Sequence, residues 1–235
     1  MLGANNKKKD YRARKVKNPK MTIFLLIRHG ENDWVGKKLA GRLPDVHLNK
    51  NGHQQAQKIA DVLKDAPIKA IYSSPMERTI ETATPLAEKL GLQIVQKPDL
   101  QEIDFGDWQG KSIKQLARRK LWKTVQNNPQ EMVFPGGESF SGAQIRLAEC
   151  LKSISQEHEE VDVVACFSHS DSIRLLVAYF LNMQLNDFQR VAIHTASVSV
   201  IHLTEKFIRV PFVNQIITQD FSSVFIDPKK KPKPV

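Results

Sequence analysis

The chain has 235 residues, of which 41% are hydrophobic, and it carries a formal net charge of +10. This composition excludes a wholly disordered or fibrous chain and is sufficient for a globular domain with its own core. No run of 18 apolar residues occurs, so we expect no membrane span. The N-terminus is basic and polar and lacks the apolar segment of a secretion signal, which favours a cytoplasmic location.

The positive charge is concentrated at the two ends of the chain. Residues 1–20 hold eight lysines and arginines against one aspartate, and residues 227–235 hold four lysines against one aspartate. Residues 21–226 are therefore electrically balanced, and we expect them to form one domain. We interpret the ends as basic, disordered, solubilising tails, the second of them rich in Pro and Lys. Nucleic acid is not an expected partner beyond weak contacts with these tails.

The two cysteines indicate neither a disulfide nor a metal site. Cys150 and Cys166 lie far apart in the sequence and in no metal-like spacing. We expect two buried, reduced thiols, as is usual in the cytoplasm. We expect no metal and no cofactor.

Short apolar runs alternate with helical patterns through the central part of the chain. Strands are expected at residues 23–27, 70–73, 92–95 and 161–167, followed by a closing hairpin over 197–203 and 207–212. Helices are expected at about 49–64, after Pro75 to residue 90, at 112–125, at 141–158 and after residue 169. This alternation predicts a three-layer α/β/α sandwich with a mainly parallel central sheet.

Two of the predicted strands end in the same way. Arg28 and His29 follow the first strand, and His169 follows the strand at 161–167. In a parallel sheet these residues share the edge at which ligands bind. Arg78 lies one turn into the helix after another strand end, and Glu102 follows the connection from the third strand. The sequence therefore predicts a cluster of two histidines, two arginines and one glutamate.

This set of side chains suits phosphoryl transfer. One imidazole can attack phosphorus, and the guanidinium groups can neutralise the equatorial oxygens, together with the second imidazole if it is protonated. A carboxylic acid can protonate the departing alkoxide. The scheme requires no metal ion, because the cationic side chains supply the positive charge.

The chain resembles the histidine phosphatase superfamily, in the branch that includes phosphoglycerate mutases and small-molecule phosphatases. The resemblance covers about residues 22–205 and is carried by six stretches, at residues 26–31, 51–56, 73–83, 100–110, 135–139 and 167–169. It implies a phosphoglycerate mutase-like fold. It also implies that His29 is the phosphorylated nucleophile and that Glu102, which matches the position in the family, is the proton donor rather than the competing carboxyl of Asp104. Arg28, Arg78 and His169 would form the phosphate pocket.

Three positions depart from the pattern of the family. Val35 stands where an Asn often helps to hold phosphate, and Asn32 is the candidate to replace that contact. Ser170 and Asp171 stand where two glycines usually follow the second histidine, so Ser170 is a candidate hydroxyl donor to the substrate. His47 replaces a proline, and we interpret it as a residue of a surface loop.

Five neighbouring side chains have less certain parts in the predicted site. Phe105 and Trp108 fit either a pocket wall or the core. Arg42 fits either a contact with a second anionic group or the surface. We expect Glu138 to be a solvated loop carboxylate and Arg174 to be structural.

The resemblance favours a metal-independent phosphatase that hydrolyses a small-molecule phosphomonoester through a phosphohistidine. The segment 105–110 and the short stretch between Glu102 and His169 favour the phosphatases over the alternative, a phosphoglycerate mutase-type transfer. A non-catalytic phosphate-binding protein would be expected to have lost at least one of the five core residues. The identity of the ester and the oligomeric state stay open, although the closing hairpin offers an edge for a homodimer.

Overall fold

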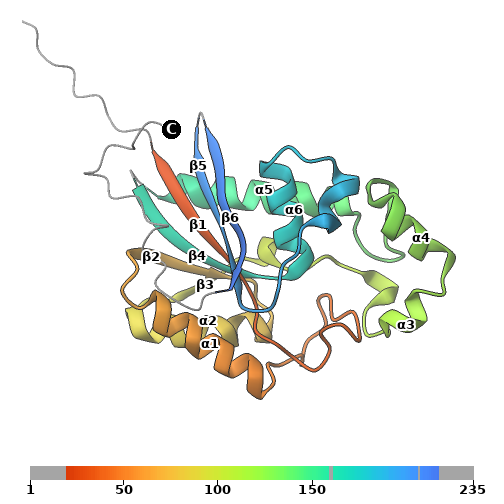
Figure 1. Cartoon of the computed structure of the whole chain (residues 1–235), viewed down its shortest axis with the longest axis horizontal. Coiled ribbons are helices and arrows are strands. Elements are labelled where there is room, and N and C mark those ends of the chain that lie inside the picture. The colour runs from red at the N-terminus through yellow and green to blue at the C-terminus, as the bar shows by residue number, and fades with distance from the viewer. Residues whose placement is uncertain (1–19, 159–160, 206, 217–235) are drawn as a thin grey trace, which may run out of the picture.

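The computed structural model describes residues 20–158, 161–205 and 207–216, which form one mixed sheet with helices on both faces (Figure 1). The basic tails expected at 1–20 and 227–235 lie outside the described residues, except for Lys20. The strands are β1 (Met21–Arg28), β2 (Ile68–Ser73), β3 (Ile94–Gln96), β4 (Val161–Ser168), β5 (Ser197–Thr204) and β6 (Ile208–Ile216). The main helices are α1 (Lys50–Leu63), α2 (Glu77–Leu90), α5 (Phe140–Glu157) and α6 (Ser170–Phe180).

The strand order is β3-β2-β4-β1-β5-β6. The pairs β1–β4, β4–β2 and β2–β3 are parallel, whereas β1–β5 and β5–β6 are antiparallel. The mainly parallel sheet, the three layers and the closing hairpin are thus confirmed. In the parallel part, the carboxyl ends of β1, β2 and β4 lie side by side, and this edge carries the predicted site.

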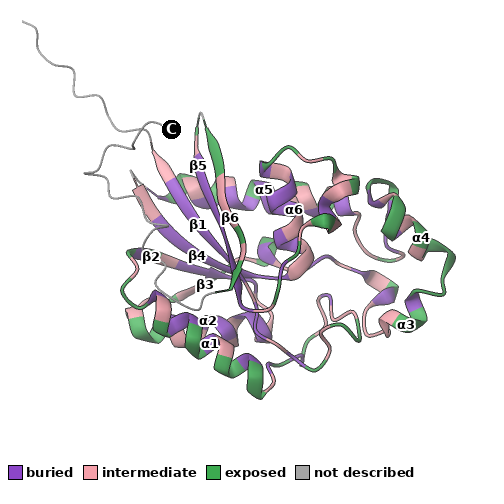
Figure 2. Ribbon diagram, in the orientation of Figure 1, coloured by how far each residue is buried: buried purple, intermediate pink, exposed green. Residues whose placement is uncertain are grey.

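The strands β1, β4 and β5 are mostly buried (Figure 2), because apolar side chains pack on both faces of this part of the sheet. On β1, Phe24 and Leu26 pack in one core cluster with residues of α5 and α6. Ile23, Leu25 and Ile27, which point to the opposite face, pack with residues of α1 and α2. This double burial explains why β1 has a continuous apolar run rather than an alternating pattern.

The helix ends follow local sequence signals. The side chain of Asn49 accepts a hydrogen bond from the backbone N–H of Gly52 at the start of α1, and the side chain of Ser139 does the same for Gly142 at the start of α5. Helix α2 ends at Gly91, whose φ of 64° is a left-handed conformation that glycine adopts without strain. These local signals mark where α1 and α5 begin and where α2 ends.

The prediction of a single helix at 112–125 is wrong. The chain forms two helices, α3 (Ile113–Leu116) and α4 (Lys120–Asn127), separated by a turn with extended backbone at Arg119. The break brings Trp122 of α4 onto Trp108, with the two rings stacked at a centroid distance of 6.1 Å. This long-range contact overrides the helical propensity of the sequence. Both helices lie beyond the carboxyl edge of the sheet (Figure 1).

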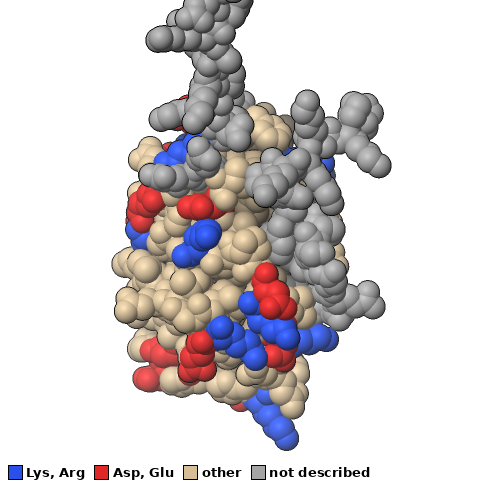
Figure 3. Space-filling model, turned by 90° about the vertical axis from the view of Figure 1, so that its left-hand side faces the viewer, with Lys and Arg blue, Asp and Glu red and all other residues tan. Residues whose placement is uncertain are grey.

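The surface shown in Figure 3 carries acidic and basic side chains close to one another, and among the described residues of this face neither sign forms a continuous patch. Within the described residues, no helix is both long and apolar enough to cross a membrane.

Candidate active site

The ends of two neighbouring strands, β1 and β4, bring the two predicted histidines together. Arg28, the last residue of β1, lies opposite Ser168 of β4 in the parallel register, so His29 and His169 follow at the same level of the sheet. The backbone N–H of His29 donates to the carbonyl of Ser168 at 3.0 Å. The two imidazole rings lie edge to face, with their centroids 5.4 Å apart. The pairing of parallel strands therefore fixes the relative position of the two rings.

His29 is held in one tautomer. Its Nδ1 lies 2.7 Å from the carbonyl oxygen of Gly30, and because a carbonyl only accepts, Nδ1 carries the proton. Burial, Arg78 and Arg28 lower the pKa of His29 well below its ordinary value. The ring is therefore neutral near pH 7, and Nε2 keeps its lone pair, which is the form that a nucleophile needs.

The backbone after His29 depends on two glycines. A Cβ atom on Gly30 would lie 2.7 Å from the carbonyl oxygen of Gly52, and a Cβ on Gly52 would lie 2.1 Å from the carbonyl oxygen of Glu31. The end of β1 and the start of α1 can approach this closely only without side chains. The N–H of Gly30 donates to Oγ1 of Thr82 on α2 at 2.9 Å. The loop that carries His29 is thus fixed against both helices of that layer.

Arg28 and Arg78 line a cavity of about 360 Å³ into which His29, Asn32, Glu102 and Ser170 also face. Arg28 Nη1 donates to the carbonyl of Ile193, and Arg78 Nη2 donates to the carbonyl of Gly41, both at 2.7 Å. Arg28 Nε, Arg78 Nε and Arg78 Nη1 are buried without a hydrogen-bond partner in the described part of the chain. Burial lowers the pKa of Arg78 to about 10, so the group stays charged at neutral pH. Such buried, unpaired donors call for an anionic ligand.

His169 is fully buried and supports Arg78 from behind the cavity. Its Nδ1 lies 3.1 Å from Arg78 Nη2, and its Nε2 lies 2.8 Å from Oγ of Ser74. Since Nη2 of an arginine only donates, Nδ1 accepts and Nε2 carries the proton. Burial, Arg78 and His29 lower the pKa of His169 well below its ordinary value. The protonated form considered from the sequence is therefore disfavoured, and the positive charge at this edge comes from the arginines.

Glu102 is buried between the loop that carries it and the first turn of α6. Its Oε1 accepts hydrogen bonds from Ile103 N at 3.1 Å, Ser172 N at 3.1 Å and Ser172 Oγ at 3.0 Å. Burial and the nearby Asp171 raise its pKa, although these bonds and Arg78 act in the opposite direction. A carboxyl group with a raised pKa can hold a proton near neutral pH and donate it.

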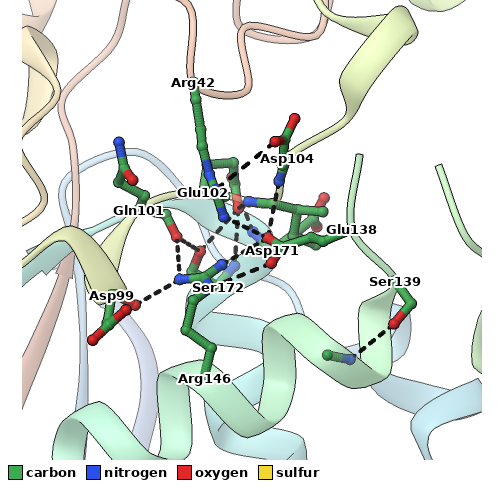
Figure 4. Close-up of polar contacts among 12 residues, drawn as sticks. Arg42, Asp99, Gln101, Glu102, Asp104, Glu138, Ser139, Arg146, Asp171 and Ser172 are labelled. Atoms are coloured by element: carbon green, nitrogen blue, oxygen red, sulfur yellow. Dashed lines mark hydrogen bonds and ion pairs between the residues drawn. The ribbon is translucent and has the colours of Figure 1, made fainter. Parts of the chain in front are cut away.

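A network of charged groups fixes the loop of Glu102 (Figure 4). Arg42 Nε donates to the backbone carbonyl of Glu102 at 2.9 Å. Arg42 Nη2 and Arg146 Nη2 each donate to Glu138 Oε1 at 2.7 Å, and the N–H of Asp104 donates to the same oxygen at 2.9 Å. The expectation that Glu138 is a solvated loop carboxylate is wrong, because two arginines hold it in place. Arg42 likewise lies inside this network rather than free on the surface.

The remaining predicted residues lie where the sequence places them. Asn32 is buried beside the cavity, and its Oδ1 accepts a hydrogen bond from Trp34 N at 2.9 Å. Ser170, the first residue of α6, is half-buried in the cavity wall, and Val35 lies in the same wall. The structure thus brings six of the seven predicted site residues to one cavity, and it places the seventh, His169, directly behind it.

Asp171, which directly follows Ser170 in α6, and Arg174, which is expected from the sequence to be structural, both lie in the wall of the cavity. They form an ion pair of 2.9 Å within the first turns of α6. The spacing of four residues between Ser170 and Arg174 puts both on one helix face, which was the signal available in the sequence. Within the described residues, no group of three or more His, Cys, Asp or Glu side chains could hold a metal ion.

Comparison with known proteins identifies the family. A family model described as the histidine phosphatase superfamily (branch 1) matches residues 24–216. The chain belongs to this superfamily. Phosphoserine phosphatase 1 of Hydrogenobacter thermophilus is 30% identical to this histidine phosphatase over 188 residues, which is 79% of this chain and 89% of that protein.

Two further relatives support the assignment. Phosphoglycerate mutase-like protein 4 of Arabidopsis thaliana is 35% identical over 159 residues, covering 65% of this chain and 68% of that protein. The solved structure of Bacillus stearothermophilus YhfR is similar with a TM-score of 0.78 at 27% identity, over 83% of this chain and 98% of that one. The phosphoglycerate mutase-like fold is therefore confirmed, and this histidine phosphatase is an enzyme of the phosphatase type.

Proposed function

We propose that this enzyme hydrolyses a small-molecule phosphomonoester without a metal ion, through a phosphorylated His29. The observation that carries the proposal is the set of buried guanidinium donors on Arg28 and Arg78, unpaired within the described residues, around a cavity shared with His29. A phosphoryl group would supply the acceptors that these donors lack. Asn32 and Ser170 complete the wall around it as further polar contacts.

In the first step, the lone pair on His29 Nε2 attacks phosphorus. An N–P bond forms while the P–O bond to the alcohol breaks. The proton of Glu102 passes to the departing oxygen, so the product leaves as a neutral alcohol. Arg28 and Arg78 stabilise the charge on the equatorial oxygens, and His169 orients Arg78.

In the second step, water attacks the phosphohistidine. Glu102, now a carboxylate, accepts a proton from this water while the O–P bond forms. The N–P bond breaks, phosphate leaves, and His29 regains its lone pair. Both groups return to their starting protonation states, so the cycle needs no further reagent.

The test is phosphate release from a panel of phosphomonoesters in the presence of EDTA. We expect the wild type to release phosphate and His29→Ala to lose the activity, whereas His53→Ala, at an exposed position on α1, should match the wild type. Rapid quenching followed by mass spectrometry should find an acid-labile phosphate on His29. Equal rates for wild type and His29→Ala, or a phosphoenzyme modified elsewhere, would contradict the mechanism.

The panel should include phosphoserine and the phosphoglycerates, because the relatives named above are called a phosphoserine phosphatase and a mutase-like protein. Isomerisation of a phosphoglycerate, stimulated by 2,3-bisphosphoglycerate and faster than hydrolysis, would instead support the mutase alternative. Phosphate release without isomerisation supports the phosphatase.

A further inference from the structure

A second cavity of about 360 Å³ adjoins the one that holds His29. The two cavities share the side chains of Leu39, Phe105, Ile113, Asp171 and Arg174. The two cavities are therefore direct neighbours, because the same five side chains line both of them. The catalytic scheme above uses only the first cavity and leaves the second unexplained.

The far wall of the second cavity is aromatic. Trp108, Trp122, Phe134 and Phe140 line it beyond the shared residues. Trp108 and Trp122 are stacked, and Trp108 meets Phe134 edge to face at a centroid distance of 5.4 Å. Walls of this kind favour a flat apolar group over a short, charged one.

Two hydrogen-bond donors on residues that line this cavity have no acceptor among the described residues. Trp108 is 1% exposed, yet its Nε1 lacks a partner within residues 20–158, 161–205 and 207–216. The same is true of Arg174 Nε, whose neighbour Nη1 is paired with Asp171. A buried indole N–H normally has a partner, so an acceptor is missing here. Because Asp171 already balances the charge of Arg174, a neutral oxygen suits this position better than a second anion.

Resting on the proposed function, we propose that the second cavity binds the alcohol portion of the substrate. The phosphomonoester would carry its phosphate between Arg28 and Arg78, and an aromatic or similarly flat apolar group bearing a neutral acceptor oxygen against Trp108 and Trp122. This assigns a substrate class different from phosphoserine or phosphoglycerate, whose short, charged alcohol portions have no ring to stack.

The test compares ethyl, 2-phenylethyl and 3-phenylpropyl phosphate. All three leave as primary alcohols, so differences in kcat/KM report the alcohol portion and not the leaving-group chemistry. We expect one of the phenyl esters to exceed ethyl phosphate by at least about tenfold, since a single methylene in an apolar pocket already contributes about tenfold or more. A ketone on the ring should increase the preference further.

Two variants test the contributions of Trp122 and Trp108 to the second cavity one at a time. Trp122→Ala should bring the ratio of phenyl to ethyl ester close to one, while Leu121→Ala, at an exposed position of α4, should leave the ratio as in the wild type. Trp108→Phe removes the N–H and keeps an aromatic ring, so it should abolish the additional gain from the ketone. A circular dichroism spectrum and melting curve of each variant show whether it is folded.

The outcomes distinguish the two proposals. If phosphate is released but the phenyl esters are no better than ethyl phosphate, or Trp122→Ala leaves the ratio unchanged, the assignment of the second cavity is wrong and the proposed function stands. If no ester is hydrolysed, the proposed function is wrong. In that case calorimetry with 3-phenylpropylphosphonate and propylphosphonate still tests the cavity: tighter binding of the phenyl compound, lost in Trp122→Ala, supports it, and equal binding refutes it.

Discussion

Glu102→Gln replaces the carboxyl group by an amide that cannot act as a general acid, while the shape of the side chain is preserved. Oε1 of Glu102 accepts from Ile103 N and from the N and Oγ of Ser172 at 3.0–3.1 Å. The amide oxygen of glutamine can accept the same three bonds. At the other oxygen only a contact of 3.4 Å with the N–H of Asp171 is lost. The folded structure should therefore survive, and the melting temperature should stay within a few degrees of the wild type.

The expected loss of activity depends on the leaving group. A general acid contributes about 10²–10⁴-fold, which corresponds to about 2.7–5.4 kcal/mol of transition-state stabilisation. For an alkyl ester such as ethyl phosphate, Glu102→Gln should lower kcat/KM by this factor. For 4-nitrophenyl phosphate, whose leaving group needs no proton, the loss in kcat/KM should stay below about tenfold. The second step still lacks its base, so a burst of 4-nitrophenolate should precede slow turnover.

The assay measures kcat/KM for both esters and the burst by stopped flow. Asp107→Asn, an exposed carboxyl of the same segment, serves as the control and should behave as the wild type. Equal losses for the alkyl and the aryl ester would refute the assignment of Glu102 as proton donor. So would a loss of less than tenfold for the alkyl ester.

Three further predictions follow from the same geometry. Glu102 must be protonated to act as an acid, so its raised pKa sets the alkaline limb of the pH profile of kcat/KM. Asp171→Asn removes a negative charge that raises this pKa, and the alkaline limb should therefore move to lower pH. Gly52→Ala places a Cβ 2.1 Å from the carbonyl oxygen of Glu31 and should lower the free energy of unfolding by about 1–3 kcal/mol in urea, whereas Gln54→Ala, exposed on the same helix, should not. Inorganic phosphate should raise the melting temperature, with a stabilisation of about 2.7 kcal/mol at a hundredfold excess over its Kd.

Each of these three predictions would be contradicted by a specific result. An alkaline limb that stays in place in Asp171→Asn would show that another group sets it. A Gly52→Ala protein as stable as the wild type would mean that α1 shifts away from the β1 loop without cost. A melting temperature unaffected by phosphate would show that the open donors of Arg28 and Arg78 are not aimed at an anion.

The sequence predicts the core of the site because the topology leaves few alternatives. Arg28, His29 and His169 follow two buried apolar runs, and parallel pairing of those runs necessarily puts the three residues on one edge. Arg78 is the second residue of α2, the helix that follows the neighbouring strand β2, rather than lying one turn into it as expected, and this position again keeps it close to that edge. Such positions depend only on strand ends, and strand ends are marked in the sequence by glycine, proline and the end of the apolar run.

The sequence does not predict the partners that hold these residues. Glu138 is fixed by Arg42 and Arg146, of which Arg42 is 96 residues away in the chain. No local pattern marks such a pair, and a carboxylate after two glycines is typical of an exposed loop. The neutral state of His169 cannot be predicted from the sequence either, because burial of the ring beside Arg78 lowers its pKa. The break between α3 and α4 depends on the stacking of one tryptophan on another.

The same distinction explains where the specificity of this enzyme should lie. Arg28, His29 and His169, which we propose act on the phosphate, lie at or directly after the ends of β1 and β4. The second cavity is instead walled by the segment around Trp108, the helix α4 and the residues near Phe134, all beyond the edge of the sheet (Figure 1). None of the strands of the described sheet lies in these segments, so we expect that they can change in sequence without moving His29 or Arg28. Because the second cavity is lined by segments outside the sheet, its shape can change while the residues that carry out phosphoryl transfer stay in place. The same reaction can then act on esters of different alcohols. Substrate preference in this chain should therefore respond to Trp122, while the rate of phosphoryl transfer should respond to Glu102.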